Sequence, residues 1–426
     1  MKRRTFLKTT ALATAGLLTP PWFVACRHLA TTEGSDPQLT VLPPGEPLPG
    51  QPQPAEIPLL VLEGSPRRRG RVHGEERRES IHAVMDLWKD LLERSHETDP
   101  DAYLKEFVAK TRFRDAIEKW TPDLMDEVIG LSEGAAIPLE TMLAYQYVDE
   151  EWWYGRNRSL GIDLSPAAKC SVCAVYGQEN TPPLLGQNLD MLSYVHGHHL
   201  LLHIREPRIG LESFVLTYSG LIGTCGLNSR SVGICVNALL QLDQRIDGLP
   251  VAFVVRGVLN QRSHDAALQF VEHVDHASGQ CYTIGGPDRI DCLECSAHAK
   301  APVTPAGNTT QICHANHPLA SEDQAIYREI IKTIPKERLE AGARDSRLRV
   351  EAMQRRLDDA EVATVATLRA ALGSHDDPVS SVCRHRPHDG RLGVESVGII
   401  MELSRPPRLY LSAVPPCSQR FTVHSF

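Results

Sequence analysis

Cys170 is the residue whose type and position could carry covalent chemistry. It follows the loop-like segment 165–169, with the sequence SPAAK, and begins a run with strand character. If the chain is cut before this cysteine, its new N-terminal amine can act as general base, and the thiol can attack an amide carbonyl. A lone cysteine that opens a strand is more often a small buried apolar residue. Whether Cys170 is a nucleophile or a buried apolar residue therefore has to be judged from the motifs around it.

Four short motifs beginning at Cys170 contain polar residues that such a nucleophile needs. They are CSVCAVY at 170–176, LGQNLD at 185–190, GTCGLN at 223–228 and VGICVNAL at 232–239. In this order they resemble the core of the acyl-CoA:6-aminopenicillanic acid acyltransferase family, which belongs to the N-terminal nucleophile hydrolases. Further matches extend the resemblance over about residues 59–426, among them Gly64-Ser65-Pro66, His73-Gly74-Glu75, Gly130 to Ala135, His314 to Pro318, Ser346 to Arg349 and Ser381 to His385.

The resemblance implies a precursor that is cut between Lys169 and Cys170, after which Cys170 attacks the acyl carbon of an amide or ester. Asp190 matches the acidic residue that orients the new amine and polar groups of the substrate. The alternative for Asp190 is a turn or capping aspartate. Arg349 matches the family arginine that steadies the nucleophile region electrostatically, with Arg347 as a neighbouring candidate.

Stabilising the oxyanion requires donors aimed at one point, and side-chain amides can supply them. Asn316 is the first candidate, and Asn237 the second, because it resembles a comparable asparagine in the related choloylglycine hydrolases. The alternative for Asn237 is a strand-end residue that bonds its own backbone. Two positions depart from the family: Lys169 stands where the penicillin-forming member has glycine, and Cys281 where relatives often carry asparagine.

The remaining cysteines predict neither a disulfide framework nor a metal site. There are eleven, an odd number. The two CxxC matches, 170–173 and 292–295, lie inside apparent strands, where residues three apart point to opposite faces and cannot chelate together. His314 and His317 are interpreted as loop or scaffold residues. The glycines before Asn237 lack the lysine of a phosphate loop, so nucleotide binding is disfavoured and no cofactor is expected.

The first 58 residues are interpreted as targeting and linker sequence. Residues 1–26 have the paired arginines Arg3 and Arg4 and a short apolar stretch, the layout of a twin-arginine export signal. Cys26 ends a segment that resembles a lipobox, so a lipid anchor there and an ordinary cleaved signal are the two alternatives. Residues 27–58 form a Pro-rich linker or, alternatively, a surface segment covered by the domain. These features predict a protein of the periplasm or cell envelope, and no later segment is apolar for long enough to span a bilayer.

The folded part changes character near residue 168. Ile81, Val84, Met85, Trp88 and Leu92 recur at helical spacing, so residues 59–169 are predicted as a mostly helical pro-segment or alpha chain. Strand-like runs follow at 171–176, 199–204, 214–218, 232–238, 282–284, 397–401 and 409–413, with helices at 265–273 and 346–357. This alternation predicts an α+β layered sandwich. With the resemblance, the fold expected for 170–426 is a four-layer αββα sandwich, and cleavage would give a heterodimer of processed chains.

The composition and charge of the chain exclude some classes of function. With 426 residues, 42% hydrophobic and 23% charged, the chain can bury a sizeable core, and its net charge of −8 offers no footprint for nucleic acid. An exported protein meets little acyl-CoA, so the expected reaction is hydrolysis of a small-molecule acyl amide, with acyl transfer as an accompanying activity. The alternatives are a lipid amidase similar to acid ceramidase and a noncatalytic envelope-tethered binding protein on the same scaffold.

Overall fold

The computed structural model describes residues 56–159, 169–177, 181–305, 310–385 and 394–426. The expected export signal, Cys26 and nearly all of the Pro-rich linker lie outside the described residues, as does the segment 160–168 before the nucleophile. Among the described residues, no helix combines the length and the apolarity needed to cross a membrane.

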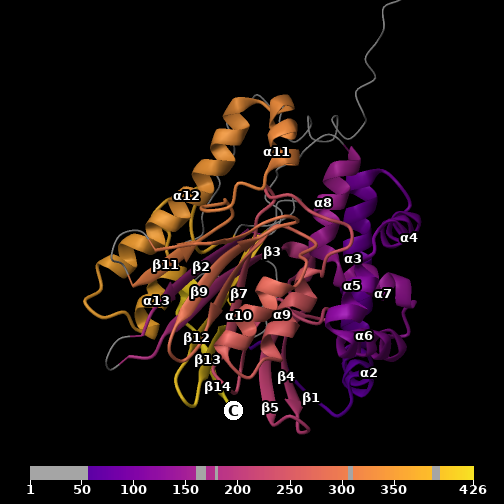
Figure 1. Cartoon of the computed structure of the whole chain (residues 1–426), viewed down its shortest axis with the longest axis horizontal. Helices are drawn as coiled ribbons and strands as arrows, with labels where there is room; N and C mark the ends of the chain where they lie inside the picture. Colours follow the sequence, from indigo (N-terminus) through magenta and orange to yellow (C-terminus); the bar gives the residue numbers. More distant parts are fainter. Residues whose placement is uncertain (1–55, 160–168, 178–180, 306–309, 386–393) are drawn as a thin grey trace, which may run out of the picture.

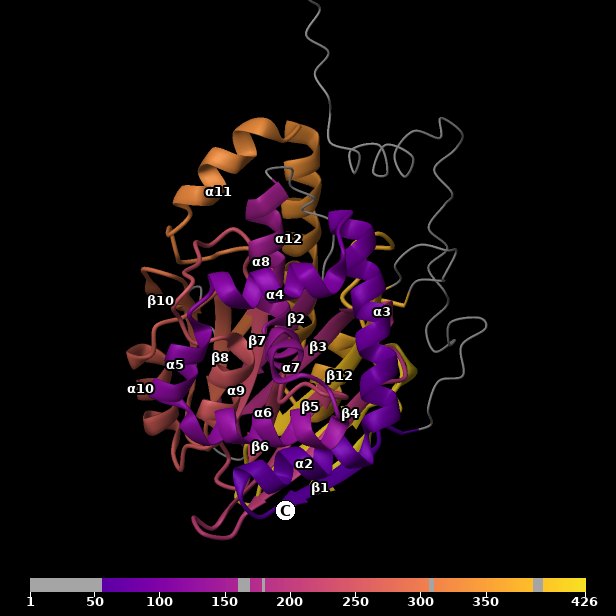
Figure 2. The same cartoon turned by 90° about the vertical axis from the view of Figure 1, so that its right-hand side faces the viewer.

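The first part of the described chain is mainly helical, as the apolar periodicity predicted. After strand β1 (Leu59–Glu63), the helices are α2 (Pro66–Glu76), α3 (Arg78–His96), α4 (Pro100–Lys110), α5 (Phe113–Trp120), α6 (Pro122–Ala135), α7 (Leu139–Gln146) and α8 (Val148–Ser159). The apolar face of α3, including Ile81, Met85 and Trp88, is buried. Figure 2 shows these helices in front of the strands.

Helices α2 and α6 approach each other closely because glycines line both sides of their contact. A Cβ added to Gly70 would lie 1.8 Å from the Glu127 carbonyl oxygen, and one added to Gly130 would lie 2.0 Å from the Arg67 carbonyl oxygen. The Glu127 carboxylate is buried at this crossing, where it pairs with Arg69 of α2 at 3.1 Å. The small residues therefore set the distance between the two backbones.

Two sheets form the rest of the framework. The eight-stranded sheet has the order β1, β4 (His199–Glu206), β5 (Leu211–Tyr218), β6 (Cys225–Asn228), β7 (Gly233–Ala238), β8 (Gln280–Gly285), β9 (Ile290–Cys295) and β10 (Lys300–Pro302). The six-stranded sheet has the order β11 (Gln311–His314), β2 (Lys169–Val175), β3 (Leu184–Leu192), β12 (Val394–Glu402), β13 (Arg408–Ser412) and β14 (Thr422–Ser425). β1 pairs with β4 in parallel, so the segment before Cys170 also supplies an edge strand.

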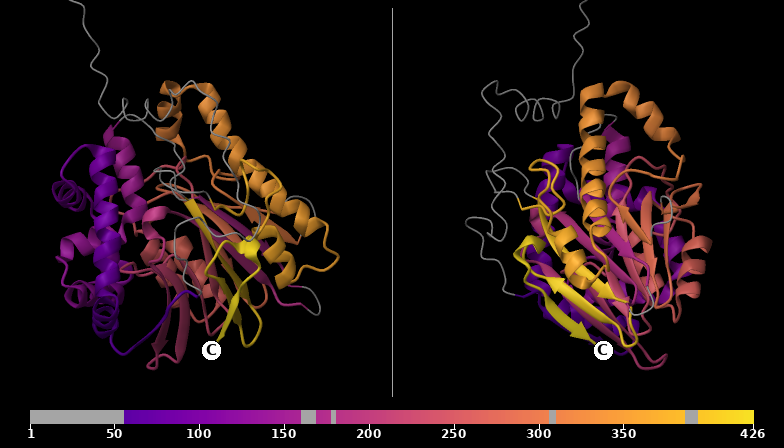
Figure 3. Two further views of the ribbon diagram at one scale, coloured as in Figure 1. Left: turned by 180° about the vertical axis from the view of Figure 1, so that it is seen from behind. Right: turned by 90° about the vertical axis from the view of Figure 1, so that its left-hand side faces the viewer.

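The two sheets meet through β2, β3 and β7, and helices lie on their other faces. α9 (Val251–Leu259) contacts β6 and β7, and α10 (His264–His273) contacts β8. α12 (Lys336–Asp358) and α13 (Val365–Leu372) contact the six-stranded sheet, while α11 (Ala325–Ile330) precedes them. Figures 1 and 3 show α12 and α13 on one side of the strands and α2 to α8 on the other. The expected α+β fold is confirmed at this level.

Side chains alternate along β2 between the two environments that this arrangement creates. Cys170, Val172 and Ala174 belong to the core that both sheets share. Cys173 and Val175 belong to a separate core with residues of α12 and α13. The thiols of the first CxxC match therefore point to opposite faces, as predicted from strand geometry.

We predict that Gly130→Ala lowers the free energy of unfolding by about 1 to 3 kcal/mol, because the new methyl group overpacks a backbone contact. Gly342 provides the control, since it lies in α12 with open space around its would-be Cβ. Gly342→Ala is expected to raise the free energy of unfolding by up to about 1 kcal/mol through helix propensity. Urea unfolding of both variants checks the pair; equal effects would contradict the close α2–α6 packing.

Candidate active site

Cys170 is the second residue of β2, directly opposite Leu189 of β3. Its side chain faces the core between the sheets and is 6% exposed. Burial raises the pKa of the Cys170 thiol to about 12, and the nearby Asp190 carboxylate adds to the rise, while the Gln187 side chain acts in the opposite direction. In the uncut chain the thiol is therefore neutral at physiological pH and needs a base before it can attack.

Asn316 lies directly against the backbone of the candidate nucleophile. The Cys170 N–H donates a hydrogen bond of 3.0 Å to Asn316 Oδ1. Asn316 Nδ2 in turn donates to the Ala238 carbonyl at the end of β7, at 3.0 Å. The carboxamide thus bridges the two sheets, with its oxygen on the nitrogen that would become the amine after cleavage. One of its two N–H hydrogens is used in the bond to Ala238, so the second can serve an oxyanion.

Arg349 of α12 holds the same region from the other face of β2. Its Nη1 donates to the Cys170 carbonyl oxygen at 2.7 Å and to Ser171 Oγ at 2.9 Å. Its Nη2 donates to Asn316 Oδ1 at 2.9 Å. The guanidinium is fully buried, whereas Arg347 is exposed. The structure therefore places Arg349, and not its neighbour, at the nucleophile.

Asp190 of β3 lies beside the predicted cut but on the opposite face of the sheet from the thiol. It pairs in register with Lys169, and residues directly opposite each other in antiparallel strands share a face. Its carboxylate is fully buried and accepts a hydrogen bond from Ser396 Oγ. Arg384 Nε lies 3.4 Å from Asp190 Oδ2, an ion-pair distance without hydrogen-bond geometry.

Asp345 of α12 completes this charged cluster. Lys169 Nζ donates to Asp345 Oδ2 at 2.9 Å, Arg349 Nε lies 3.4 Å from the same oxygen, and Arg384 also pairs with this carboxylate. Two carboxylates and three cations thus share one largely buried space behind β2. The residue before the predicted cut is fixed there by its ammonium group.

The same cluster separates the pKa values of its two acids. Burial raises the pKa of Asp190 to about 6, and Arg384 only partly offsets that rise. Burial also disfavours the Asp345 anion, yet Arg384, Arg349 and Lys169 together hold the pKa of Asp345 well below its usual range. The pKa of Lys169 is lowered to about 8, first by burial and then by Arg384. Asp345 is thus the permanent anion of the cluster, and Asp190 is the acid that titrates within it.

Asn237 is not joined to Cys170 by any hydrogen bond between described residues. It lies in β7 opposite Cys281, fully buried, and neither atom of its carboxamide has a partner within the part of the chain that the structure describes. The alternative of a bond to its own backbone is therefore not realised there. A buried amide without a partner costs free energy, and Asn237 is not among the residues that line the cavity at Cys170, although its neighbours Val236 and Ala238 are.

A narrow cavity of about 40 Å³ reaches the Cys170 side chain. Its walls come from α8, β2, β3, β7 and α9 and are mostly apolar, with Trp152, Leu189 and Val236 among them. Asp149 and Gln280 add polar groups, and burial raises the pKa of Asp149 to about 7. The lining is thus mainly apolar, with a few polar groups.

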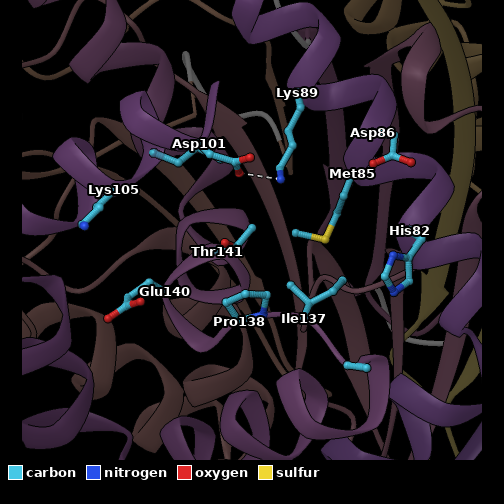
Figure 4. Close-up of a pocket in the computed structure, with 12 residues that line it drawn as sticks. His82, Met85, Asp86, Lys89, Asp101, Lys105, Ile137, Pro138, Glu140 and Thr141 are labelled. Atoms are coloured by element: carbon cyan, nitrogen blue, oxygen red, sulfur yellow. Dashed lines mark ion pairs between the residues drawn. The ribbon is translucent and has the colours of Figure 1, made fainter. Parts of the chain in front are cut away.

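A larger cavity, of about 430 Å³, lies elsewhere, among α3, α4 and the start of α7. Figure 4 shows Lys89 pointing to Asp101 across it, with their ion pair at 2.6 Å. Its lining contains none of the predicted site residues. Volume alone therefore does not locate the chemistry, and we assign the site from the contacts of Cys170.

The model of the acyl-coenzyme A:6-aminopenicillanic acid acyl-transferase family matches residues 176–392, half of the chain. The chain belongs to this family. Asp190, Asn237, Asn316 and Arg349 fall inside the matched region, whereas Cys170 lies six residues before it. Membership implies an enzyme of the acyltransferase and hydrolase type. No curated protein matches the chain.

Sequence reasoning did not identify three residues that contact the site. Gln187 and Arg384 stand inside motifs that carried the resemblance, but no role was assigned to them. Asp345 directly precedes the Ser346 motif. Most of their ion pairs and hydrogen bonds join segments far apart in the chain, which no local spacing reveals. The exception is Asp345, which stands four residues before Arg349 in α12, a spacing that favours an ion pair on a helix.

We predict that Asp190→Asn removes a pH dependence of stability. The pKa of Asp190 is about 6 in the folded chain and ~3.9 when unfolded, so the folded state binds more protons between these values. This contribution is fully present below pH ~4 and is lost as the pH rises to about 6. The unfolding free energy of the Asp190 chain, minus that of the Asn variant, should fall by on the order of 2 to 3 kcal/mol.

Urea titrations from pH 4 to 7 measure this difference. Both chains carry Cys170→Ala, so that a cut before residue 170 does not complicate the comparison. A difference that stays constant, or that grows with rising pH, would show that Asp190 is not a buried acid with a raised pKa.

Proposed function

We propose that this protein is a cysteine N-terminal nucleophile amidohydrolase that cleaves an acyl-amide bond through an acyl-enzyme on Cys170. Its two sheets and flanking helices would correspond to the four-layer αββα sandwich of such enzymes. The observation that carries the proposal is the meeting of Asn316 and Arg349 at Cys170, with hydrogen bonds to both its N–H and its C=O. These hydrogen bonds hold the backbone of Cys170 in one position, as a nucleophile that must be aligned with its substrate requires.

Maturation would begin with attack by Cys170 Sγ on the carbonyl carbon of Lys169. The sulfur–carbon bond forms, the Lys169–Cys170 C–N bond breaks, and the proton of the thiol passes to the leaving nitrogen. Water then hydrolyses the thioester, which leaves a carboxylate on Lys169 and a free thiol and amine on Cys170. Two observations support this sequence: Asn316 already accepts from the Cys170 nitrogen, and Asp345 anchors the Lys169 side chain.

In turnover, the freed amine would take the proton of the thiol, and the thiolate would attack the acyl carbon of the substrate. Asn316 Nδ2 and Asn237 Nδ2 are the side-chain donors proposed for the oxyanion. The amine product leaves with the proton, and water hydrolyses the acyl-enzyme. Asp190 would orient the new amine, because it pairs in register with the residue on the other side of the cut.

The two processed chains would stay together as a heterodimer. Glu127 of α6 pairs with Arg256 of α9 at 2.7 Å, and both are buried. The Glu150 carboxylate of α8 accepts from the Val251 N–H at 3.0 Å and from Ser278 Oγ at 2.7 Å. These contacts join the segment before residue 169 to the segment after it, and α8 also supplies Trp152 to the cavity at Cys170.

We further propose export by the twin-arginine route to the periplasm or cell envelope, with Cys26 as the point of lipid attachment if the lipobox is used. In that setting water, not an amine supplied with acyl-CoA, is the acceptor. The substrate class is therefore an amide between an apolar acyl group and an amine. Acyl transfer to a second amine would be an accompanying reaction of the same acyl-enzyme.

Cys170→Ala is expected to leave the chain uncut and to abolish hydrolysis of phenylacetyl and decanoyl anilides, because both steps need the same sulfur. Cys173→Ala is the matched control: this thiol lies in the same strand, equally buried, but faces α12 and α13. It should retain both processing and turnover. Electrophoresis and anilide release measure the two steps. Processing or turnover that survives in Cys170→Ala would refute the mechanism, and an uncut wild-type chain indifferent to thiol alkylation would favour a noncatalytic binding protein.

A further inference from the structure

Four side chains that commonly bind metal ions meet away from the nucleophile. His375, Cys383, His385 and Cys417 each offer one ligand atom, and these atoms all lie within 4.8 Å of one another. Cys383 and His385 are buried, and the other two are half-buried. We refer to these four residues as the His2Cys2 cluster.

We propose that the His2Cys2 cluster binds a structural zinc ion. Ligands at the ~2.0 to 2.3 Å zinc distances of a tetrahedron lie roughly 3.3 to 3.8 Å apart. His375 Nε2 lies 3.3 Å from His385 Nε2, and Cys417 Sγ lies 3.5 Å from the same His385 atom. Two imidazoles and two thiolates favour zinc over the hard cations magnesium and calcium. Four protein ligands would close the coordination sphere, which is typical of a structural site rather than a catalytic one.

The four ligands come from three segments that the fold has already brought together. His375 follows α13, Cys383 and His385 lie between α13 and β12, and Cys417 lies in the 3-10 helix η3 (Pro416–Ser418) after β13. A Cβ added to Gly373 would lie 3.1 Å from the Cα of Cys417, so these segments pack backbone to backbone. The spacing of the four residues resembles no zinc finger, and neither cysteine belongs to a CxxC pair.

The His2Cys2 cluster would also fix the position of Arg384, which stands between two of its ligands. The Arg384 N–H donates to Ser396 Oγ at 2.8 Å, and its carbonyl accepts from the Ser396 N–H at 2.9 Å. Its guanidinium reaches Asp190 and Asp345 behind β2. The zinc ion is thus proposed as a positioning element: it would hold the loop that delivers one cation to the charged cluster. This inference does not depend on the proposed amidase activity.

Binding has a defined proton balance. Two thiols lose their protons and two neutral imidazoles donate lone pairs, so the zinc complex carries no net charge and loading releases two protons from fully protonated thiols. The competing chemistry for the same sulfur atoms is a disulfide between Cys383 and Cys417, which needs an external oxidant and excludes the metal. A test of the proposal therefore has to distinguish zinc-bound thiolates from a Cys383–Cys417 disulfide.

We expect about one zinc per full-length chain, measured by plasma mass spectrometry on protein purified without chelator. Cys417→Ser and His375→Ala should each lower the zinc content at least about fivefold. Cys225→Ser and His82→Ala, a buried thiol and an exposed imidazole outside the cluster, should leave it unchanged. Cobalt added to the metal-free, reduced wild-type chain should produce the visible bands of tetrahedral Co²⁺ with thiolate ligands, which keeps the test valid if a variant fails to fold.

Three results would overturn the zinc proposal. One is wild-type protein that contains no zinc and gives no cobalt spectrum after reduction. Another is zinc content that the cluster variants and the control variants share equally. The third is a Cys383–Cys417 disulfide in peptide maps of the protein isolated from its native compartment without reductant.

Discussion

The hydrogen bonds of Arg349 and Asn316 to the backbone of Cys170 are the interaction on which the rest of the site depends. Arg349 is a fully buried cation that contacts the Cys170 carbonyl, Ser171 and Asn316. Hydrogen bonds to charged groups contribute about 1.5 to 3 kcal/mol each, whereas a buried charge that loses its partners costs several kcal/mol. The start of β2 is therefore held by a group that the fold cannot leave unpaired, and Asp345 supplies the compensating charge.

Strand alternation divides the chemistry of this region between two faces of one sheet. The Cys170 thiol faces the apolar core, while Lys169, Ser171 and Asp190 face the charged cluster under α12. Burial on the apolar side raises the pKa of the thiol, so the charged groups behind the strand do not by themselves ionise it. In the proposed mechanism, the amine freed beside the sulfur by cleavage would supply the base for turnover.

Sequence patterns predicted the helix with clear apolar periodicity and most strands that consist of a short apolar run. The helical spacing around Trp88 became α3, and the runs at 199–204 and 397–401 became β4 and β12. Two segments were missed: α9 is buried on every side, so its apolar residues show no clear periodicity, and β3 includes Gly186, Asn188 and Asp190, which disfavour strands. Tertiary hydrogen bonds, such as those of the Asn188 amide with the Leu372 and Val382 carbonyls, stabilise β3 instead.

Some residues of the candidate site were predicted from the sequence and others were not. Cys170, Asn316 and Arg349 were predicted from motifs, and the structure brings them together; Asp190 lies beside them on the other face, and Asn237 has no hydrogen bond to them. Arg384 could not be predicted, because its ion pairs with Asp190 and Asp345 join distant segments and leave no local pattern. Asp345 had a local signal, its i,i+4 spacing to Arg349, but its pairs with Lys169 and Arg384 did not. The His2Cys2 cluster was not predicted either, because its ligands come from separate segments with no regular spacing. The fold brings together residues that are far apart in the sequence and have no regular spacing.

The intact masses and N-terminal sequences of the mature protein report directly whether the chain is cut before Cys170. We expect two chains, the larger one starting with an unblocked Cys170 and the smaller one ending at Lys169. A catalytically active protein in which the Lys169–Cys170 peptide bond is intact would contradict the proposed mechanism, because the thiol would then have no N-terminal amine beside it.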